Sequence, residues 1–392
     1  MKTVFTMGNF DGVHLGHQKI LKQLVKAAHK IGGSSVVYTF HPHPAKVMAP
    51  EVNLKLLQTQ RQKMKAIKDC AVDTCIVEPF TPDFAKMSPQ EFFDRVILKR
   101  IKPKQIIVGH DLTFGWHRQG TVELLEDLCR KHGIGIEIVE PVFLDEMLIS
   151  STQIRKFVSE GMVEMAAKML GRPFTLEGKV IKGRGIGEEI NCHTANLEVE
   201  NEIIPKSGVY ITKTLDLASV TNIGYNPTFG GSTLSVETHI LNFSKDIYGK
   251  KLEICFYKRL RAERIFKNKD LLKGQIEKDI AEAKNFFNHP FVVGLIGRNF
   301  GRRERLLQRK FKASFKKRDM PYVYLLLKTA PKYLKNIITC MKLMDVMEVH
   351  ISPEYSKKVI PYLDNLDKSA KEVGKVSLIT RQGKRFVGYS HF

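Results

Sequence analysis

The stretch Gly8-Asn9-Phe10-Asp11-Gly12-Val13-His14-Leu15-Gly16-His17 determines how we interpret the rest of this chain. It follows an apolar run, Val4–Met7, and precedes residues 15–31, whose apolar side chains recur at helical spacing. A strand, a glycine-containing turn and a helix favour phosphate binding, because the first N–H groups of the helix are unpaired and its positive dipole end faces the ligand. His14 and His17 can point to one side, where two imidazoles would stabilise charge during phosphoryl or nucleotidyl transfer. The alternative is a chance pair of histidines at an ordinary helix start.

The composition is that of a globular protein with two or three domains. The chain has 392 residues, of which 43% are hydrophobic and 27% are charged. The N-terminus lacks the apolar core of a signal peptide, and no apolar run approaches the length of a membrane span. The six cysteines include no C-x-x-C pair, so neither a disulfide framework nor a structural zinc site is expected. We therefore expect a cytoplasmic protein without a membrane partner.

Positive charge is concentrated at the C-terminal end of the chain. The net charge is +22, and residues 289–392 contribute +14 of it through 22 basic and 8 acidic residues. The first 288 residues carry the remaining +8, a mild excess that suits anionic nucleotides.

The first part of the chain, up to about Arg172, alternates short β-branched runs with helical patterns. The predicted strands are Val4–Met7, Ser35–Phe40, Thr74–Val77, Gln105–Gly109 and Gly135–Val139, and the predicted helices lie near residues 57–69, 89–101 and 120–132. Such alternation predicts a Rossmann-like parallel sheet flanked by helices, with ligands at the carboxyl ends of the strands.

Three further loops after these strands carry candidate site residues. The segment Phe40-His41-Pro42-His43-Pro44 could ligate a metal, but its two prolines favour a turn. The glycine-flanked loop 109–115 carries Asp111 and Phe114, and a flavin ring needs an apolar or aromatic wall with a few polar anchors. Residues 149–155 begin a helix whose polar side chains either cap it or receive a triphosphate. These side chains belong to Ser150, Ser151, Thr152 and Arg155.

Two of these segments, G-x-F-D-G-x-H-x-G-H and the I-S-S-T-x-I-R of residues 149–155, resemble the nucleotidyltransferase motifs of a known family. They are similar to the FMN adenylyltransferase half of the bacterial bifunctional riboflavin kinase/FAD synthetases, over residues 1–172. The resemblance implies that both motifs close over one ATP, with His14, His17 and Arg155 as catalytic residues and a flavin near Asp111 and Phe114. The implied ATP- and phosphate-binding residues of this half are Gly8, Phe10, Asp11, Gly12, Gly16, Ser150, Ser151 and Thr152.

Residues 174–262 are strand-like and turn-rich, which predicts a small antiparallel β-barrel, and a helical run, Asp270–Phe287, follows it. The order of the Gly183–Gly187 loop, Thr194-Ala195-Asn196, Asn222–Gly230 and Val236–Leu241 resembles the riboflavin kinase module of the same family. The resemblance implies that Glu237 is the catalytic base, whereas an outward-facing strand carboxylate is the structural alternative. It also implies metal ligands at Thr194 and Asn196, ATP-binding residues at Gly183 and Gly185, and flavin-binding residues at Asn222 and Arg261.

One departure from the family pattern concerns the kinase. The family normally reads Gly-Phe-Pro before the Thr-Ala-Asn motif, and this chain has Asn191-Cys192-His193. Losing glycine and proline changes the backbone freedom of that loop. Weakened kinase activity, and hence a monofunctional FAD synthetase, is therefore an alternative to the bifunctional enzyme.

Residues 289–392 alternate strands and helices again, which predicts a third, α/β domain. From V-G-L-I-G at residues 293–297 to V-G-Y at residues 387–389, it resembles the substrate-binding half of shikimate dehydrogenase. The family's paired serines fall at Arg303 and Arg305, its catalytic lysine at Ser356 and its catalytic aspartate at Phe392. Dehydrogenase activity is therefore not expected. This domain is either a decayed one retained for assembly or stability, or one whose basic face, residues 298–318, binds RNA or an acidic partner. A charged helical face is ordinarily just solvated.

The expected architecture is thus multidomain, α/β plus β, with domains at residues 1–172, 173–288 and 289–392. The resemblance implies that ATP and riboflavin give FMN at the barrel, and that FMN and a second ATP give FAD and pyrophosphate at the first domain. Mg²⁺ is the expected cofactor. The non-enzyme alternative is a flavin- or RNA-binding regulator.

Overall fold

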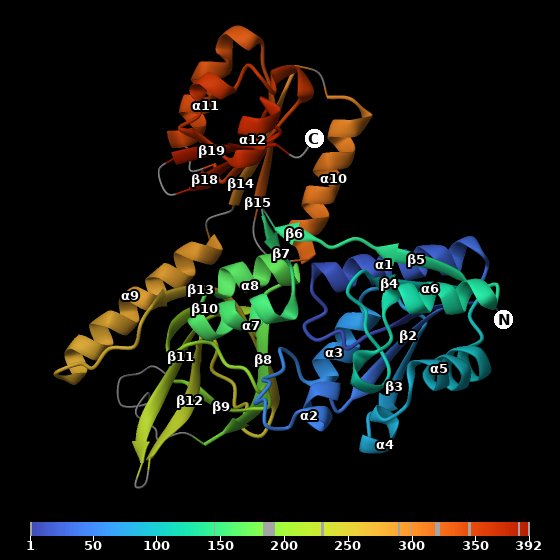
Figure 1. Ribbon diagram of the computed structural model, residues 1–392. Coiled ribbons are helices and arrows are strands. Elements are labelled where there is room, and N and C mark those ends of the chain that lie inside the picture. The colour runs from blue at the N-terminus through green and yellow to red at the C-terminus, as the bar shows by residue number, and fades with distance from the viewer. Residues whose placement is uncertain are drawn as a thin grey trace. The chain divides into compact units, whose positions relative to one another are not determined.

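The computed structural model describes residues 2–144, 146–182, 193–228, 231–288, 291–298, 300–317, 322–343, 346–382 and 385–390. The chain divides into two compact units, Met1–Ile280 and Ala281–Phe392. The first unit contains a parallel sheet and a closed barrel, which follow one another in the chain (Figure 1).

The sheet half has five parallel strands in the order β3-β2-β1-β4-β5, as predicted. The strands are β1 (Thr3–Met7), β2 (Ser34–His41), β3 (Thr74–Pro79), β4 (Gln105–Gly109) and β5 (Gly135–Val139). Because β2 and β3 lie on one side of β1 while β4 and β5 lie on the other, the strand order reverses between β1 and β4. Ligands bind at such a reversal, outside the carboxyl ends of the strands.

Helices cover both faces of this sheet. Leu21 and Leu24 of α1 pack with Ile67 of α3 on one face, and Ile97 of a π-helix packs with Leu125 of α6 on the other. The predicted helix at 89–101 divides into a short α-helix and this wider π-helix. The helices of this half are α1 (Leu15–Lys30), α2 (Pro44–Met48), α3 (Gln60–Lys68), α4 (Pro82–Ala85), α5 (Pro89–Phe92), the π-helix η1 (Phe93–Ile101), the 3₁₀ turn η2 (Trp116–Arg118), α6 (Val122–Lys131), α7 (Ser151–Glu160) and α8 (Val163–Leu170). A two-stranded hairpin, β6 (Phe143–Leu144) and β7 (Met147–Leu148), precedes α7.

The second half of this unit is the predicted antiparallel barrel, closed in the order β10-β11-β12-β9-β8-β13. Its strands are β8 (Phe174–Ile181), β9 (Ala195–Val199), β10 (Gly208–Thr214), β11 (Leu217–Thr228), β12 (Gly231–Ile240) and β13 (Lys251–Arg261), and α9 (Lys269–Asn288) follows. Tyr210, Ile223 and Phe256 belong to its apolar core. Thr212, Thr221 and Thr238 are buried and share hydrogen bonds, so the interior also has a hydroxyl-lined part.

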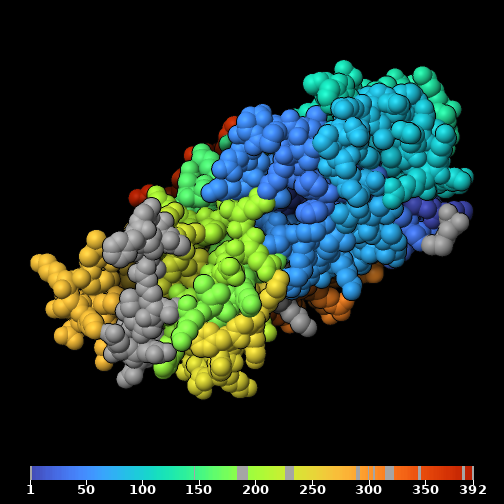
Figure 2. All heavy atoms as spheres, turned by 90° about the horizontal axis from the view of Figure 1, so that it is seen from below, coloured from blue at the N-terminus to red at the C-terminus, as the bar shows by residue number. Residues whose placement is uncertain are grey.

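The sheet half and the barrel are joined by polar contacts at the start of α3. Glu177 of β8 is only 1% exposed, and its carboxylate binds Arg61 and the hydroxyl of Thr59. Gln62 and Asn201 add an amide contact of 2.9 Å beside this pair. Figure 2 shows the blue surface near α2 and α3 directly against the green surface of the barrel. The predicted boundary at residue 172 thus falls inside one compact unit.

The second unit is the predicted third α/β region. Its six-stranded sheet has the order β15-β14-β16-β18-β19-β17, with β14 parallel to both of its neighbours. The elements are β14 (Phe291–Gly297), α10 (Arg302–Lys317), β15 (Tyr322–Lys328), η4 (Pro331–Tyr333), α11 (Leu334–Leu343), β16 (Glu348–Ile351), η5 (Pro353–Tyr355), η6 (Ile360–Tyr362), β17 (Asn365–Leu366), α12 (Lys368–Val373), β18 (Leu378–Gln382) and β19 (Arg385–Tyr389). None of the helices in the described ranges combines the length and the apolar character that a membrane span requires.

Candidate active site

The first motif forms a crowded turn between β1 and α1. Gly12 has a φ of +84°, and a Cβ there would lie 2.8 Å from the Leu57 side chain. Gly16 faces the His14 ring, which a Cβ would approach to 3.1 Å. Larger side chains would therefore displace either the turn or the imidazole. Phe10, predicted at the phosphate site, is buried and has a φ of 51°.

The two imidazoles are stacked at the start of α1. Their centroids are 3.7 Å apart with an interplanar angle of 20°, and the Phe10 ring meets His17 edge-on at 5.2 Å. His14 caps the helix, since its Nδ1 accepts the His17 N–H at 3.4 Å. The ordinary helix-start interpretation therefore describes part of its role. His17 Nδ1 is buried and has no hydrogen-bond partner among the described residues, which leaves it available to a ligand.

The surroundings of both imidazoles favour their neutral form. Burial, together with the Arg172 and Arg155 guanidinium groups, lowers the pKa of His14 to about 4. Burial, His14 and Arg172 lower the pKa of His17 well below its usual range. Arg172 follows α8 and donates to the carbonyl oxygens of Gly12 at 2.7 Å and Val13 at 3.1 Å. It therefore holds the turn in place as well as acting on the imidazoles.

The second motif meets the first, although about 140 residues separate them in the chain. Arg155 Nη2 lies 2.6 Å from Asp11 Oδ2, and Ser151 Oγ donates to the Asp11 carbonyl oxygen at 2.8 Å. Ser150 caps α7 by accepting the Gln153 N–H at 3.2 Å, so the capping alternative holds for this residue. The predicted approach of the two motifs is thus present in the fold.

Asp11 connects the first motif to the loop before α3. Its side chain is 5% exposed and accepts the Leu57 N–H at 3.0 Å in addition to the Arg155 contact. Burial raises the pKa of Asp11, whereas the Arg155 guanidinium and the Leu57 N–H act in the opposite direction. Thr152, by contrast, is exposed at the start of α7.

A cavity of about 230 Å³ opens beside Asp11. Its floor includes Lys63 of α3, a residue that our sequence analysis missed, whose Nζ donates to the Phe40 carbonyl oxygen at 3.0 Å. Burial lowers the pKa of this lysine, and Asp11 opposes that effect. The complete lining comprises Asn9, Asp11, Phe40, His41, His43, Leu56, Gln58, Thr59, Gln60, Lys63, Glu200 and Glu202. Of these residues, Glu200 and Glu202 come from the barrel half.

The Phe40–Pro44 segment forms a turn that leads into α2, as the prolines predict. His43 caps α2 by accepting the Ala45 N–H at 3.2 Å, and burial lowers its pKa to about 4. Within the ranges that the structure describes, no group of three or more His, Cys, Asp and Glu side chains could hold a metal ion.

The two predicted flavin-binding residues of the sheet half, Asp111 and Phe114, lie in different surroundings. Asp111 is exposed beyond the end of β4. Phe114 lies in the core, where its ring is 5.8 Å from that of Phe92 and its backbone pairs with Gly120. Its position is explained by packing, and a flavin-binding role for either residue stays a prediction.

Three predicted residues of the barrel form a row across adjacent strands. Asn222 of β11 lies directly opposite Glu237 of β12, which lies directly opposite Asn196 of β9. Directly paired residues share a face of a sheet, and this face is opposite the buried side chains of Thr221 and Thr238. Glu237 is therefore outward-facing, as the structural alternative expected, but two amides flank it. The Ser235 hydroxyl lies 2.8 Å from its carboxylate.

Thr194 lines a second cavity, of about 300 Å³, together with Thr238 and Tyr248. Arg261, predicted to bind flavin, is paired with the buried carboxylate of Asp279 at 2.7 Å. Gly183, Gly185, Asn191 and Cys192 lie outside the described residues, so the altered kinase loop is described only from His193 onward.

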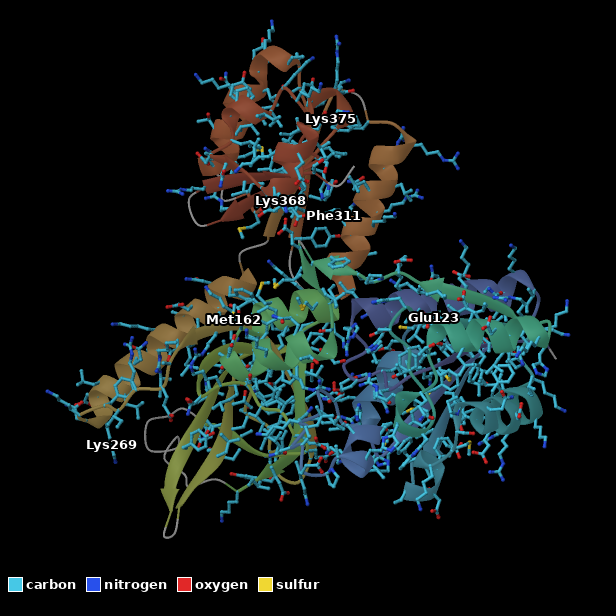
Figure 3. All side chains as sticks on the ribbon, in the orientation of Figure 1. Glu123, Met162, Lys269, Phe311, Lys368 and Lys375 are labelled. Atoms are coloured by element: carbon cyan, nitrogen blue, oxygen red, sulfur yellow. The ribbon has the colours of Figure 1, made fainter. Side chains whose placement is uncertain are left out.

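In the second unit, Phe311 of the basic helix α10 packs its ring against the sheet. The Phe311 ring lies 4.4 Å from that of His350 and 6.0 Å from that of Tyr324 (Figure 3). Ser356 is buried and donates to the Pro353 carbonyl oxygen at 2.7 Å. Among the side chains of α10 that the structure describes, the exposed basic ones belong to Arg302, Arg305, Arg309, Lys310 and Lys312. The side chain of Arg303, and Phe392, lie outside the described residues.

The fold and the two candidate sites define an ATP-using transferase with a nucleotidyltransferase half and a kinase half. A family model described as FAD synthetase matches residues 1–153, and one described as riboflavin kinase matches residues 170–287. The bifunctional riboflavin kinase/FMN adenylyltransferase of Buchnera aphidicola subsp. Schizaphis graminum is 35% identical over 291 residues, covering 72% of this chain and 93% of that protein. The chain belongs to the family of bifunctional riboflavin kinase/FMN adenylyltransferases.

One solved structure shares the fold over most of the chain. Described as a macrolide-efflux protein from Streptococcus pneumoniae, it has a TM-score of 0.67 at 30% identity, covering 72% of this chain and 94% of that chain. A shikimate 5-dehydrogenase from Listeria monocytogenes covers 26% of this chain and 34% of its own, with a TM-score of 0.24 at 26% identity.

Proposed function

We propose that this chain phosphorylates riboflavin to FMN on the barrel and adenylylates FMN to FAD on the sheet half. The observation that carries the second reaction is the meeting of Asp11 with Arg155 and Ser151 at the carboxyl end of β1. A triphosphate at this position would face the start of α1 and the start of α7, whose free N–H groups favour anions.

Adenylyl transfer needs alignment and charge stabilisation rather than a covalent intermediate. The FMN phosphate attacks the α-phosphorus of ATP, and the bond to the β-phosphate oxygen breaks to release pyrophosphate. His14 and His17 donate hydrogen bonds to the crowded phosphate oxygens, and the approaching negative charge raises their pKa. Ser151, Thr152 and Arg155 hold the pyrophosphate as it leaves.

Arg155 must change partners for this role. In the structure, its guanidinium binds Asp11 and, through Nε, the Lys55 carbonyl oxygen at 2.9 Å. Lys63, which lines the cavity beside Asp11, supplies a second basic side chain. We assign both side chains to neutralising the triphosphate.

In the kinase half, Glu237 accepts the proton of the terminal ribityl hydroxyl as that oxygen attacks the γ-phosphorus of ATP. Its position between Asn222 and Asn196 supports this role, because amides beside a carboxylate can orient the hydroxyl and the phosphate. Gly183 and Gly185 are proposed to approach the ATP phosphates. Asn222 and Arg261, with Asp111 and Phe114 in the sheet half, are proposed to contact the flavin.

The donor chemistry of Thr194 and of Asn196, the residue opposite Glu237, suits a divalent cation. Thr194 and Asn196 offer a hydroxyl and an amide oxygen, and Mg²⁺ in kinases takes few protein ligands and fills its shell with phosphate oxygens and water. When bound there, Mg²⁺ would neutralise the phosphate charge of ATP. The alignment of the acceptor hydroxyl is a task for Glu237 and its neighbours in the row.

The deciding experiment supplies riboflavin, ATP and Mg²⁺ and separates FMN from FAD by chromatography. Formation of both products supports the bifunctional assignment. FAD formed from FMN but not from riboflavin would select the alternative, a monofunctional FAD synthetase whose Asn191-Cys192-His193 loop has impaired the kinase. A flavin- or RNA-binding regulator would form neither product.

We assign adenylyl transfer to residues 1–172, phosphorylation to 173–288, and no dehydrogenase chemistry to 289–392. We also propose a cytoplasmic location, which the scattered cysteines of the sequence, without a C-x-x-C pair, favour.

A further inference from the structure

Three consecutive residues, Lys55-Leu56-Leu57, form a strap over the adenylyl-transfer site. Arg155 Nε donates to the Lys55 carbonyl oxygen at 2.9 Å, and the Leu57 N–H donates to Asp11 at 3.0 Å. The strap is therefore attached to both nucleotidyltransferase motifs.

The third attachment comes from the other half of the chain. The Leu56 N–H donates to Glu202 Oε2 at 2.8 Å, and Glu202 lies between β9 and β10 of the barrel. Its other carboxylate oxygen binds Lys46 of α2. Leu56 and Glu202 both line the cavity beside Asp11. The N–H groups of Leu56 and Leu57 thus donate to carboxylates from different halves of the molecule, Glu202 of the barrel and Asp11 of the sheet half.

We propose that Glu202 is a positioning residue for adenylyl transfer, through which the barrel holds the strap against Asp11 and Arg155. This inference rests on the proposed function of the cavity. Residues 55–57 belong to no helix or strand, so contacts with side chains determine where the strap lies. Without Glu202, the Leu56 N–H and Lys46 lose their common partner. The buried Leu57 side chain still anchors one end of the strap, but its remaining polar attachments are Asp11 and Arg155, the two groups that we propose ATP engages.

The test compares both reactions of the full-length chain. Glu202→Ala should lower kcat/KM for ATP in FAD formation by about tenfold, mainly through KM, because a charge-assisted hydrogen bond is lost. Glu202→Gln keeps an oxygen for the Leu56 N–H and should recover most of this loss. Lys46→Met removes only a partly exposed ion pair and should change kcat/KM by less than about threefold.

FMN formation by the same variants is the internal control, since it uses the barrel and not the strap. It should stay unchanged, as should FAD formation in the matched variant Glu198→Gln, which alters an exposed carboxylate on β9. Unchanged kcat/KM for ATP in Glu202→Ala would overturn the proposal, and so would equal losses in both reactions. FAD formation that is absent even from the unsubstituted chain would instead refute the proposed function on which the inference rests.

Discussion

Replacing His14 with asparagine should reduce the loss of stability that acid causes in the sheet half. His14 is 7% exposed, and burial beside two arginines lowers its pKa from 6.5 to about 4. Between these values the unfolded chain binds a proton that the folded chain excludes. The contribution of this residue to stability is therefore fully present above pH 6.5 and is lost as the pH falls toward 4.

The magnitude follows from the size of the shift. One pKa unit corresponds to about 1.4 kcal/mol, so protonation of His14 in the unfolded chain should lower the free energy of unfolding by about 2–3 kcal/mol by about pH 4.5. Asparagine does not titrate, and it is a good N-cap for α1. The variant should therefore show a pH dependence that is smaller by about this amount.

The chain offers a specific probe for this measurement. Trp116 is the single tryptophan of the sequence and lies in η2 of the sheet half, so its fluorescence during urea titration reports on that half. His29→Asn, at an exposed position in the last turn of α1, is the matched control and should change the free energy of unfolding by less than about 0.5 kcal/mol. Equal pH dependence in the unsubstituted chain and in His14→Asn would refute the reasoning.

Three further predictions concern the remaining sites. Arg155→Met leaves the Asp11 carboxylate buried without its ion-pair partner and should lower FAD formation from FMN by about a hundredfold or more, with FMN formation as the unaffected control. Glu237→Gln should lower riboflavin phosphorylation by about 10²–10⁴-fold while FAD formation from supplied FMN is retained, and undiminished phosphorylation would remove Glu237 as the base. Reversing the charges of Arg305 and Arg309 should leave both flavin reactions unchanged. A salt-sensitive loss of RNA binding in that variant would identify α10 as an RNA-binding face.

The architecture was predictable where a pattern extends over a whole element. The strands Gln105–Gly109 and Gly135–Val139 have the predicted bounds, because their apolar runs end at turn residues and a buried strand needs such a run. The approach of the two motifs was expected from the family resemblance, whereas strand order alone does not predict it, because α7 follows the β6–β7 hairpin and not a strand of the parallel sheet. The π-helix Phe93–Ile101 was not, because its residues fit an ordinary amphipathic helix equally well.

The site was less predictable where single residues act through tertiary contacts. Lys63 is one of several lysines on an amphipathic helix, and only the fold shows that its amine reaches the Phe40 carbonyl oxygen. Arg172 was predicted only as part of a boundary, yet it holds the first motif. Glu202 belongs to the other half of the unit, so no local pattern could connect it with Leu56.

The buried pairing of Glu177 with Arg61 and Thr59 constrains how this enzyme can be rebuilt. A chimera that joined its barrel to the sheet half of a relative would leave that carboxylate facing foreign side chains, and a buried charge without a matched cation is costly. Exchange of modules within the family should therefore succeed only when the start of α3 travels together with β8. The contacts between the halves, rather than the linker that joins them, therefore decide which segments must be exchanged together.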